Sequence, residues 1–242
     1  MSSVQQVILQ ACLNGSRDVD EHPAVPVTAS ACAEDARAAV EAGAQDLHVH
    51  PRTDDGRDSL APADVARWVE AVREAVDVPV GVTTGAWAWT GGGTPIRAVG
   101  TWTTLPDHAS VNWHERGATD LATALHERGV AVNAGLWTED AAQAWLDSSW
   151  PERTALVLLE LADAPDQEET AERLLELVRP TGLPVLLHGE GRSTWPMLEL
   201  AVAHGVSTRI GLEDVVEGPD GGAVDDNAEL VRIAVGRGAR RV

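Results

Sequence analysis

The sequence lacks three common residue types entirely. Its 242 residues include no Lys, no Phe and no Tyr, so all 18 basic side chains are Arg, and nine Trp supply the large aromatic side chains. Without a lysine amine, a Schiff-base aldolase or a pyridoxal-phosphate enzyme is excluded, and so is the Gly-Lys-Ser/Thr of a P-loop. Either drift in a GC-rich genome or a deliberately reduced amino-acid alphabet explains this composition.

Cysteine and positive charge are also scarce. Cys12 and Cys32 alone make no disulfide framework. A net charge of -20 repels phosphate backbones and anionic lipid surfaces, so we expect no nucleic-acid partner and no membrane partner. No apolar run reaches the roughly 18 residues of a membrane span, and the N-terminus lacks the pattern of a secretory signal. We therefore expect a cytoplasmic protein.

Strand-like and helix-like segments alternate along the chain. The segments expected as strands are apolar and β-compatible: 7–13, 46–50, 79–84, 109–113, 130–137, 155–161, 183–188 and 208–212. The segments expected as helices carry apolar residues at helical spacing: 34–42, 62–76, 120–128, 139–146, 167–178, 195–203 and 227–235. Such alternation indicates a parallel α/β fold, and eight units in this length favour a (β/α)8 TIM barrel formed by residues 1–242 as one domain.

Polar side chains collect where the expected strands end, which is where the active sites of such barrels lie. They are His48, His50, Thr83, Thr84, Ser110, Asn112, Asn133, Glu160, His188, Glu190, Arg209, Glu213 and Asp214. This set supplies every candidate site residue except Arg17, which lies in the loop after the first strand.

His48 and His50 are the strongest candidates for a metal site. They are two residues apart on one strand, so their side chains share a face. The second and eighth strands both border the first in a closed barrel, which brings Glu213 within reach. Two imidazoles and one carboxylate with open positions suit a catalytic Zn²⁺. A surface pair of histidines is the alternative, and the carboxylate at the end of the eighth strand favours the metal site.

The residues around Glu213 leave several roles open. Arg209 beside Asp214 suits a general base held ionised by a guanidinium, but equally a structural ion pair that closes the barrel. His188 fits a fourth metal ligand, a substrate contact or a packed core histidine. Glu160 either orients a ligand or faces solvent at the rim.

Six runs of residues together resemble the β-keto acid cleavage enzyme family, over nearly the whole chain. They are Leu13-Asn14-Gly15, His22–Thr28, His48-Val49-His50, Thr83-Thr84-Gly85, Arg209–Asp214 and Asn227–Val231. The early His-Val-His paired with a late Arg-Ile-Gly-Leu-Glu-Asp is the most specific part of the match.

The resemblance implies a (β/α)8 barrel with Zn²⁺ on the two histidines and Glu213. It implies that a β-keto acid reacts with acetyl-CoA to give acetoacetate and the CoA ester of the shortened acid. Arg209 and Asp214 would remove a proton beside the ketone, and Thr83 and Thr84 would contact the substrate. Ser110, Asn112, Asn133 and Arg17 are further expected substrate contacts, and a homotetramer is the expected assembly.

Two positions bear on substrate and rate. The family usually has a glutamate on the fifth strand, where this sequence has Asn133, which carries no charge. Arg17 lies near the position that selects the substrate, and an arginine there favours an anionic distal group.

Two other functions are the alternatives to a β-keto acid cleavage enzyme. One is a metal-dependent hydrolase of the amidohydrolase type, which normally has His-x-His on the first strand. The other is a barrel that folds without doing chemistry.

Overall fold

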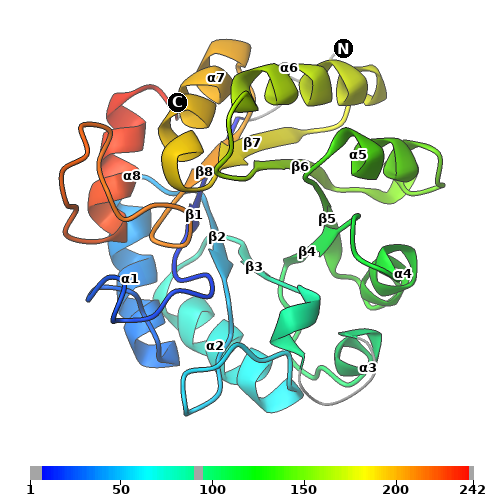
Figure 1. The fold of residues 1–242 in the computed structure, drawn as a ribbon. Helices are drawn as coiled ribbons and strands as arrows, with labels where there is room; N and C mark the ends of the chain where they lie inside the picture. Colours follow the sequence, from blue (N-terminus) through cyan, green and yellow to red (C-terminus); the bar gives the residue numbers. More distant parts are fainter. Residues whose placement is uncertain (1–6, 90–94, 240–242) are drawn as a thin grey trace.

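Eight parallel β-strands form a ring at the centre of the protein (Figure 1). The structure is a computed structural model that describes residues 7–89 and 95–239. The strands are β1 (Leu9–Cys12), β2 (Asp46–Val49), β3 (Val80–Val82), β4 (His108–Asn112), β5 (Ala131–Leu136), β6 (Leu156–Leu161), β7 (Val185–Gly189) and β8 (Thr208–Ile210). From β2 to β7 each strand pairs in parallel with the one before it, and β8 pairs with β1.

The ring closes between β7 and β8. Leu186 and Ser207 form a parallel bridge, and the Ser207 amide donates to the Val185 carbonyl at 3.0 Å. The Leu187 amide donates to the Ser207 carbonyl at 2.9 Å. The predicted (β/α)8 barrel is thereby confirmed.

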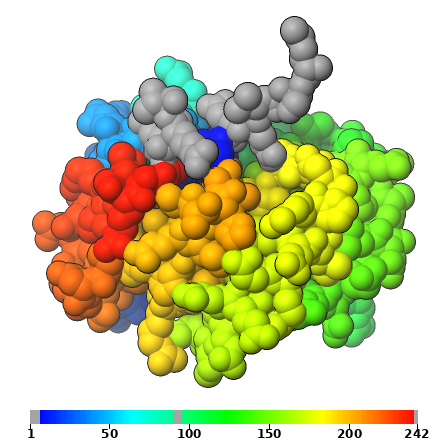
Figure 2. All heavy atoms as spheres, turned by 90° about the horizontal axis from the view of Figure 1, so that it is seen from above, coloured from blue at the N-terminus to red at the C-terminus, as the bar shows by residue number. Residues whose placement is uncertain are grey.

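Helices surround the ring on the outside (Figure 1). They are α1 (Ala29–Ala42), α2 (Pro62–Ala75), α3 (Pro95–Val99), α4 (Ala118–Glu127), α5 (Glu139–Leu146), α6 (Gln167–Val178), α7 (Thr194–His204) and α8 (Asn227–Gly236). Their apolar stripes pack on the strands, as expected for amphipathic helices. Figure 2 views the barrel from the side of α6, α7 and α8, whose side chains cover the strands there.

The structure differs from the sequence prediction mainly at the ends of elements. Helix α1 begins at Ala29 rather than at residue 34, because the Thr28 hydroxyl caps it by accepting from the Ala31 amide at 3.2 Å. Helix α3 was not predicted, since five residues are too few to show a helical period. β2 ends at Val49 and β3 at Val82, so His50 and Thr83 follow their strands directly.

Tryptophan fills the largest positions of the core. Trp68, Trp102, Trp145 and Trp150 are among its largest fully buried side chains. The indole N–H of Trp68 donates to the Arg52 carbonyl at 3.1 Å, and that of Trp145 to the Thr154 hydroxyl at 3.0 Å. A buried indole needs such an acceptor.

Over the described residues, no helix has both the length and the apolar character to cross a membrane.

Candidate metal centre and active site

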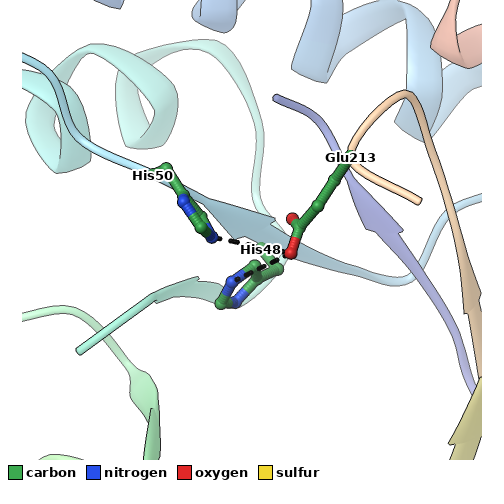
Figure 3. Close-up of side chains that lie close together, drawn as sticks. All are labelled: His48, His50 and Glu213. Atoms are coloured by element: carbon green, nitrogen blue, oxygen red, sulfur yellow. Dashed lines mark ion pairs between the residues drawn. The ribbon is translucent and has the colours of Figure 1, made fainter. Parts of the chain in front are cut away.

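The two histidines and Glu213 meet at the mouth of the barrel (Figure 3). Glu213 Oε1 lies 3.5 Å from His50 Nε2 and 3.9 Å from His48 Nε2. One ligand atom from each residue lies within 4.8 Å of the others, and these three residues are the only such group in the described part of the chain. β1 pairs with both β2 and β8, which is why side chains about 165 positions apart in sequence converge, as the sequence predicted.

The backbone around these side chains is tightly specified. The Asn14 amide group holds His50 from both sides, donating to its carbonyl and accepting from its amide, each at 2.9 Å. Gly15 has φ +53°, and a Cβ there would lie 2.5 Å from Glu213 Cγ. A side chain at position 15 would therefore be strained and would push Glu213 out of place. Asn14 and Gly15 belong to the Leu-Asn-Gly run singled out in the sequence.

Burial and neighbouring charges shift the pKa of each of the three residues. Burial lowers the pKa of His48 well below its ordinary value, although the charge of Glu213 opposes this. Burial also opposes a charge on His50, but the carboxylates of Glu213 and Asp58 raise its pKa to about 9. Burial opposes ionisation of Glu213 too, yet Arg209 and the two histidines hold its pKa well below the usual range. The site thus contains an ionised carboxylate, which His50 and Arg209 face.

Arg209 joins Glu213 to Asp214. Its Nη2 atom lies 2.9 Å from Glu213 Oε1 and 2.9 Å from Asp214 Oδ1, and its Nε donates to Asp214 Oδ2 at 3.2 Å. Asp214 also accepts from the Cys12 thiol at 3.1 Å and faces His188 Nδ1 at 3.3 Å. Burial opposes its ionisation, but Arg209 and His188 lower the pKa of Asp214. Asp214 is fully buried beneath Arg209.

A cavity of about 290 Å³ lies in front of the metal-site residues. It is lined by His48, His50, Glu213, Arg209, Arg17, Thr83, Ser110 and Asn112 among the predicted residues. Asp214 is not on its wall, because the guanidinium of Arg209 covers it. The cavity therefore combines the metal-site residues, one guanidinium and several neutral hydrogen-bonding groups.

Two predicted substrate contacts lie elsewhere. The Thr84 hydroxyl donates to the Ser110 carbonyl at 2.6 Å and is not on the cavity wall. The Asn133 side chain contacts His108 Nδ1 at 3.0 Å, and His108 Nε2 lies 3.0 Å from Asp46 Oδ1. Asp46 precedes His48 by two positions on β2, so Asn133 belongs to a buried polar layer below the active site.

Arg17 lies on the cavity wall with its charge already paired. Its Nη1 atom lies 2.8 Å from Glu21 Oε2, and its Nε donates to the Glu213 carbonyl at 3.1 Å. The expectation that Arg17 favours an anionic substrate group assumed an unpaired guanidinium. In the structure Glu21, four residues later, is the partner of this guanidinium.

Several cavity residues were missed or left undecided from the sequence. Glu160 at the end of β6 lines the cavity rather than facing solvent, as do Glu190 after β7 and Trp137 after β5. Asp58 is not on the cavity wall and was missed altogether, and its Oδ2 lies 3.5 Å from His50 Nδ1. Alternate residues of a strand point to the same face, so Glu160 shares a face with Leu158, and Glu190 shares one with His188. This alternation was the signal in the sequence that could have placed both glutamates in the cavity. Asp58 lies in a loop, where no periodicity operates.

Fold and site together define a (β/α)8 barrel with a His-His-Glu constellation at its mouth. The chain belongs to the beta-keto acid cleavage enzyme family, whose sequence profile matches residues 6–240. It is 27% identical over 255 residues to the 3-keto-5-aminohexanoate cleavage enzyme of Fusobacterium nucleatum, covering 96% of this chain and 91% of that protein. The resemblance noted in the sequence is thereby confirmed.

Further relatives are more partial or share only the fold. The 3-oxoadipate:acetyl-CoA acetyltransferase of Cupriavidus necator is 34% identical over 129 residues, which are 51% of this chain and 42% of that protein. The solved 3-dehydroquinate dehydratase of Aquifex aeolicus matches with a TM-score of 0.59 and 15% identity, over 94% of this chain and 97% of that one. At this identity the structural likeness shows the barrel alone.

Proposed function

We propose that this protein is a zinc-dependent acyltransferase that converts a β-keto acid and acetyl-CoA into acetoacetate and the acyl-CoA of the shortened acid. The observation that carries the proposal is the convergence of His48, His50, Glu213 and Arg209 on one cavity. Family membership and the names of the two relatives, one acting on a keto acid and one using acetyl-CoA, support it.

The three metal-site residues fit a zinc ion. Two ligand atoms of one zinc ion, each about 2.0–2.2 Å from it, are at most about 4 Å apart. Glu213 Oε1 lies 3.5 Å from His50 Nε2 and 3.9 Å from His48 Nε2, and both separations satisfy that limit. Glu213 Oε2 is buried and has no hydrogen-bond partner among the described residues, so the carboxylate has capacity left for a cation. Bound zinc would act as a Lewis acid that polarises the ketone oxygen and favours loss of the neighbouring proton.

The cavity residues then bind and orient the substrate. Thr83, Ser110 and Asn112 line the wall beyond the histidines and offer hydrogen bonds to the carboxylate of the β-keto acid. The Arg209 guanidinium stabilises negative charge that develops between the carboxylate and the ketone.

We assign proton removal to the Arg209–Asp214 pair. Asp214 accepts the proton from the carbon between carboxylate and ketone, and that carbon then bonds to the acetyl carbonyl while CoA leaves as the thiolate. The thiolate attacks the ketone carbon of the original β-keto acid, and the bond between this carbon and the acetylated carbon breaks. This gives the new acyl-CoA and the acetoacetate carbanion, which takes the proton back. Because Asp214 has no exposed surface, Arg209 must shift during this step, and its movement is part of the proposal.

The test is product analysis by mass spectrometry after incubation of the zinc-loaded protein with acetyl-CoA and a pool of β-keto acids. We expect acetoacetate together with one new acyl-CoA. Unchanged CoA species, in protein with confirmed zinc, would contradict the proposal. Hydrolysis of an ester or amide without CoA would point to a hydrolase instead. The homotetramer stays a prediction, which sedimentation analysis would test.

A further inference from the structure

One hydrogen-bond donor beside the cavity has no acceptor. Trp137 follows β5, its side chain lines the cavity, and its Nε1 atom is buried without a hydrogen-bond partner among the described residues. Other buried indoles of this protein have one, since the N–H of Trp102 donates to the Leu60 carbonyl at 2.9 Å and that of Trp195 to the Glu217 carbonyl at 3.0 Å. A buried N–H without a partner costs free energy, so the unpaired donor of Trp137 calls for a functional explanation.

Strand alternation places the Trp137 side chain inside the barrel. Trp137 is two residues beyond Gly135 and four beyond Asn133, which lies in the polar layer below the active site. Alternate residues of a strand point to the same face, so the indole stands above that layer, where the cavity lies. Its ring packs edge-on against the imidazole of His114 after β4, with 5.0 Å between the ring centres. The indole is thus fixed by the strand and by the neighbouring ring.

Trp137 lies across the ring of strands from the metal-site residues. β5 is four strands away from β1 in both directions around the ring, whereas the two histidines come from the end of β2 and Glu213 follows β8 (Figure 1). A β-keto acid whose ketone faces the histidines therefore has Trp137 on its far side. The acetyl group of acetyl-CoA has to approach from that side, because Arg209 and the metal-site residues occupy the other.

The other side-chain N–H donors on the cavity wall already have partners. Apart from the two metal-site histidines, each of them pairs with an acidic side chain: Arg17 with Glu21, Trp87 with Asp58, Asn112 with Glu115, and Arg209 with Glu213 and Asp214. Within the described ranges, Trp137 therefore carries the one side-chain N–H of this wall that has no partner at all.

One oxygen atom of the proposed reaction has no partner either. The ketone faces the metal site, and the carboxylate faces Thr83, Ser110 and Asn112. When the deprotonated carbon bonds to the acetyl carbonyl carbon, the π electrons of that carbonyl move onto its oxygen, which becomes an alkoxide. They return when the carbon–sulfur bond breaks and CoA leaves as the thiolate. A fixed N–H donor stabilises the alkoxide more than the uncharged carbonyl, and it therefore accelerates this step.

We propose that Trp137 is a catalytic residue whose indole N–H donates a hydrogen bond to the carbonyl oxygen of the acetyl thioester and stabilises the alkoxide that forms there. The indole keeps its proton throughout, and no electrons pass to it. Its partner belongs to acetyl-CoA, so Trp137 acts alike with every β-keto acid that the protein converts. The inference rests on the proposed function, to which it adds a residue for the thioester half of the reaction.

Trp137→Phe removes the N–H and keeps an aromatic ring. We expect kcat for acyl transfer to fall by about 10²- to 10³-fold, as on removal of one donor from an oxyanion site. KM for the β-keto acid should change less than about threefold, because the acid is not the partner of the indole. Trp195→Phe is the matched control, since it loses an indole N–H outside the cavity and should leave both constants unchanged. Undiminished kcat in Trp137→Phe would overturn the assignment.

Hydrogen exchange at the carbon between carboxylate and ketone tells the thioester from the acid as the partner of Trp137. In heavy water without acetyl-CoA, the zinc-loaded protein should exchange these hydrogens through Arg209 and Asp214. Trp137→Phe should keep the exchange rate within about threefold of the unmodified protein, whereas Asp214→Asn should lose it. Equal losses of exchange and transfer in Trp137→Phe would overturn the proposal, because the indole would then act on the acid or on the fold. An unmodified protein that neither exchanges nor transfers would contradict the proposed function itself.

The indole N–H of Trp137 also gives a readout that does not depend on turnover. Its signal in a ¹H–¹⁵N spectrum is identified as the one missing from Trp137→Phe. In the Asp214→Asn protein with a β-keto acid present, acetyl-CoA should move this signal to lower field, as a hydrogen bond does to an N–H proton. S-ethyl-CoA, a thioether without the carbonyl, should move it much less. The same movement with both compounds, or none with acetyl-CoA, would overturn the proposal.

Discussion

Replacement of Asp214 by Asn separates proton transfer from metal binding. Asp214 contacts no metal-site imidazole, and its charge is balanced by Arg209 through bonds of 2.9 and 3.2 Å. The amide has nearly the same shape but cannot accept a proton at neutral pH. Loss of a general base typically costs about 10²- to 10⁴-fold in rate, so we expect kcat to fall by that factor while zinc content stays at one ion per chain.

The same substitution has a predictable effect on stability. It leaves Arg209, which is 2% exposed, with Glu213 as its one remaining carboxylate. Breaking a buried ion pair costs about 3–5 kcal/mol, and the amide oxygen keeps one hydrogen bond, so about 3 kcal/mol is expected. For a chain of this length that lowers the melting temperature by about 6–12 °C.

The assay combines zinc analysis, steady-state kinetics and thermal unfolding on one preparation. Asp147→Asn is the control, because it makes the same chemical change at an exposed position on the end of α5 and should alter none of the three. Asp214→Asn with full zinc and undiminished kcat would refute the assignment of the base. Loss of zinc would instead show that Asp214 supports the metal site through Arg209 and Glu213.

Three further predictions concern metal binding and pH. His48→Ala and Glu213→Gln should each lose both zinc and turnover, as measured by metal analysis and product formation, and retained zinc in either would contradict the ligand assignment. Asp58→Asn removes the carboxylate beside His50 Nδ1 and should weaken zinc binding by about 10- to 100-fold in a chelator competition, with turnover restored by excess zinc. Burial raises the pKa of Asp35 from 3.8 to about 7, so the folded state binds its proton more tightly than the unfolded state and stability falls as pH rises from about 4 to 7. The shift in pKa corresponds to about 4 kcal/mol of stability, or about 2 kcal/mol after allowance for partial exposure. Asp35→Asn should therefore be about 2 kcal/mol more stable than the unmodified protein at pH 8, as measured by urea unfolding. The difference should shrink towards pH 4, and an advantage independent of pH would contradict the account.

Local pattern was sufficient for the barrel itself. Apolar, β-compatible runs and period-3.6 stripes placed the eight strands and seven of the eight helices in the described residues, because strands of a parallel barrel are buried on both faces and its helices on one. It failed at Thr28, where a single hydroxyl extends α1 by five residues, and at α3, which is shorter than any readable period.

The sequence by itself determined the metal-site candidates. His48 and His50 share a face because alternate residues of a strand always do, and Glu213 joins them because β1 lies between β2 and β8 in any closed barrel of this connectivity. Only the tertiary structure decided the depth and the partner of each polar group. It places Asn133 below the site, and it puts Glu160 and Glu190 on the wall of one cavity. Such choices depend on the stagger between strands and on which opposite charge packs closest, and neither quantity is encoded in the spacing of residues along one strand.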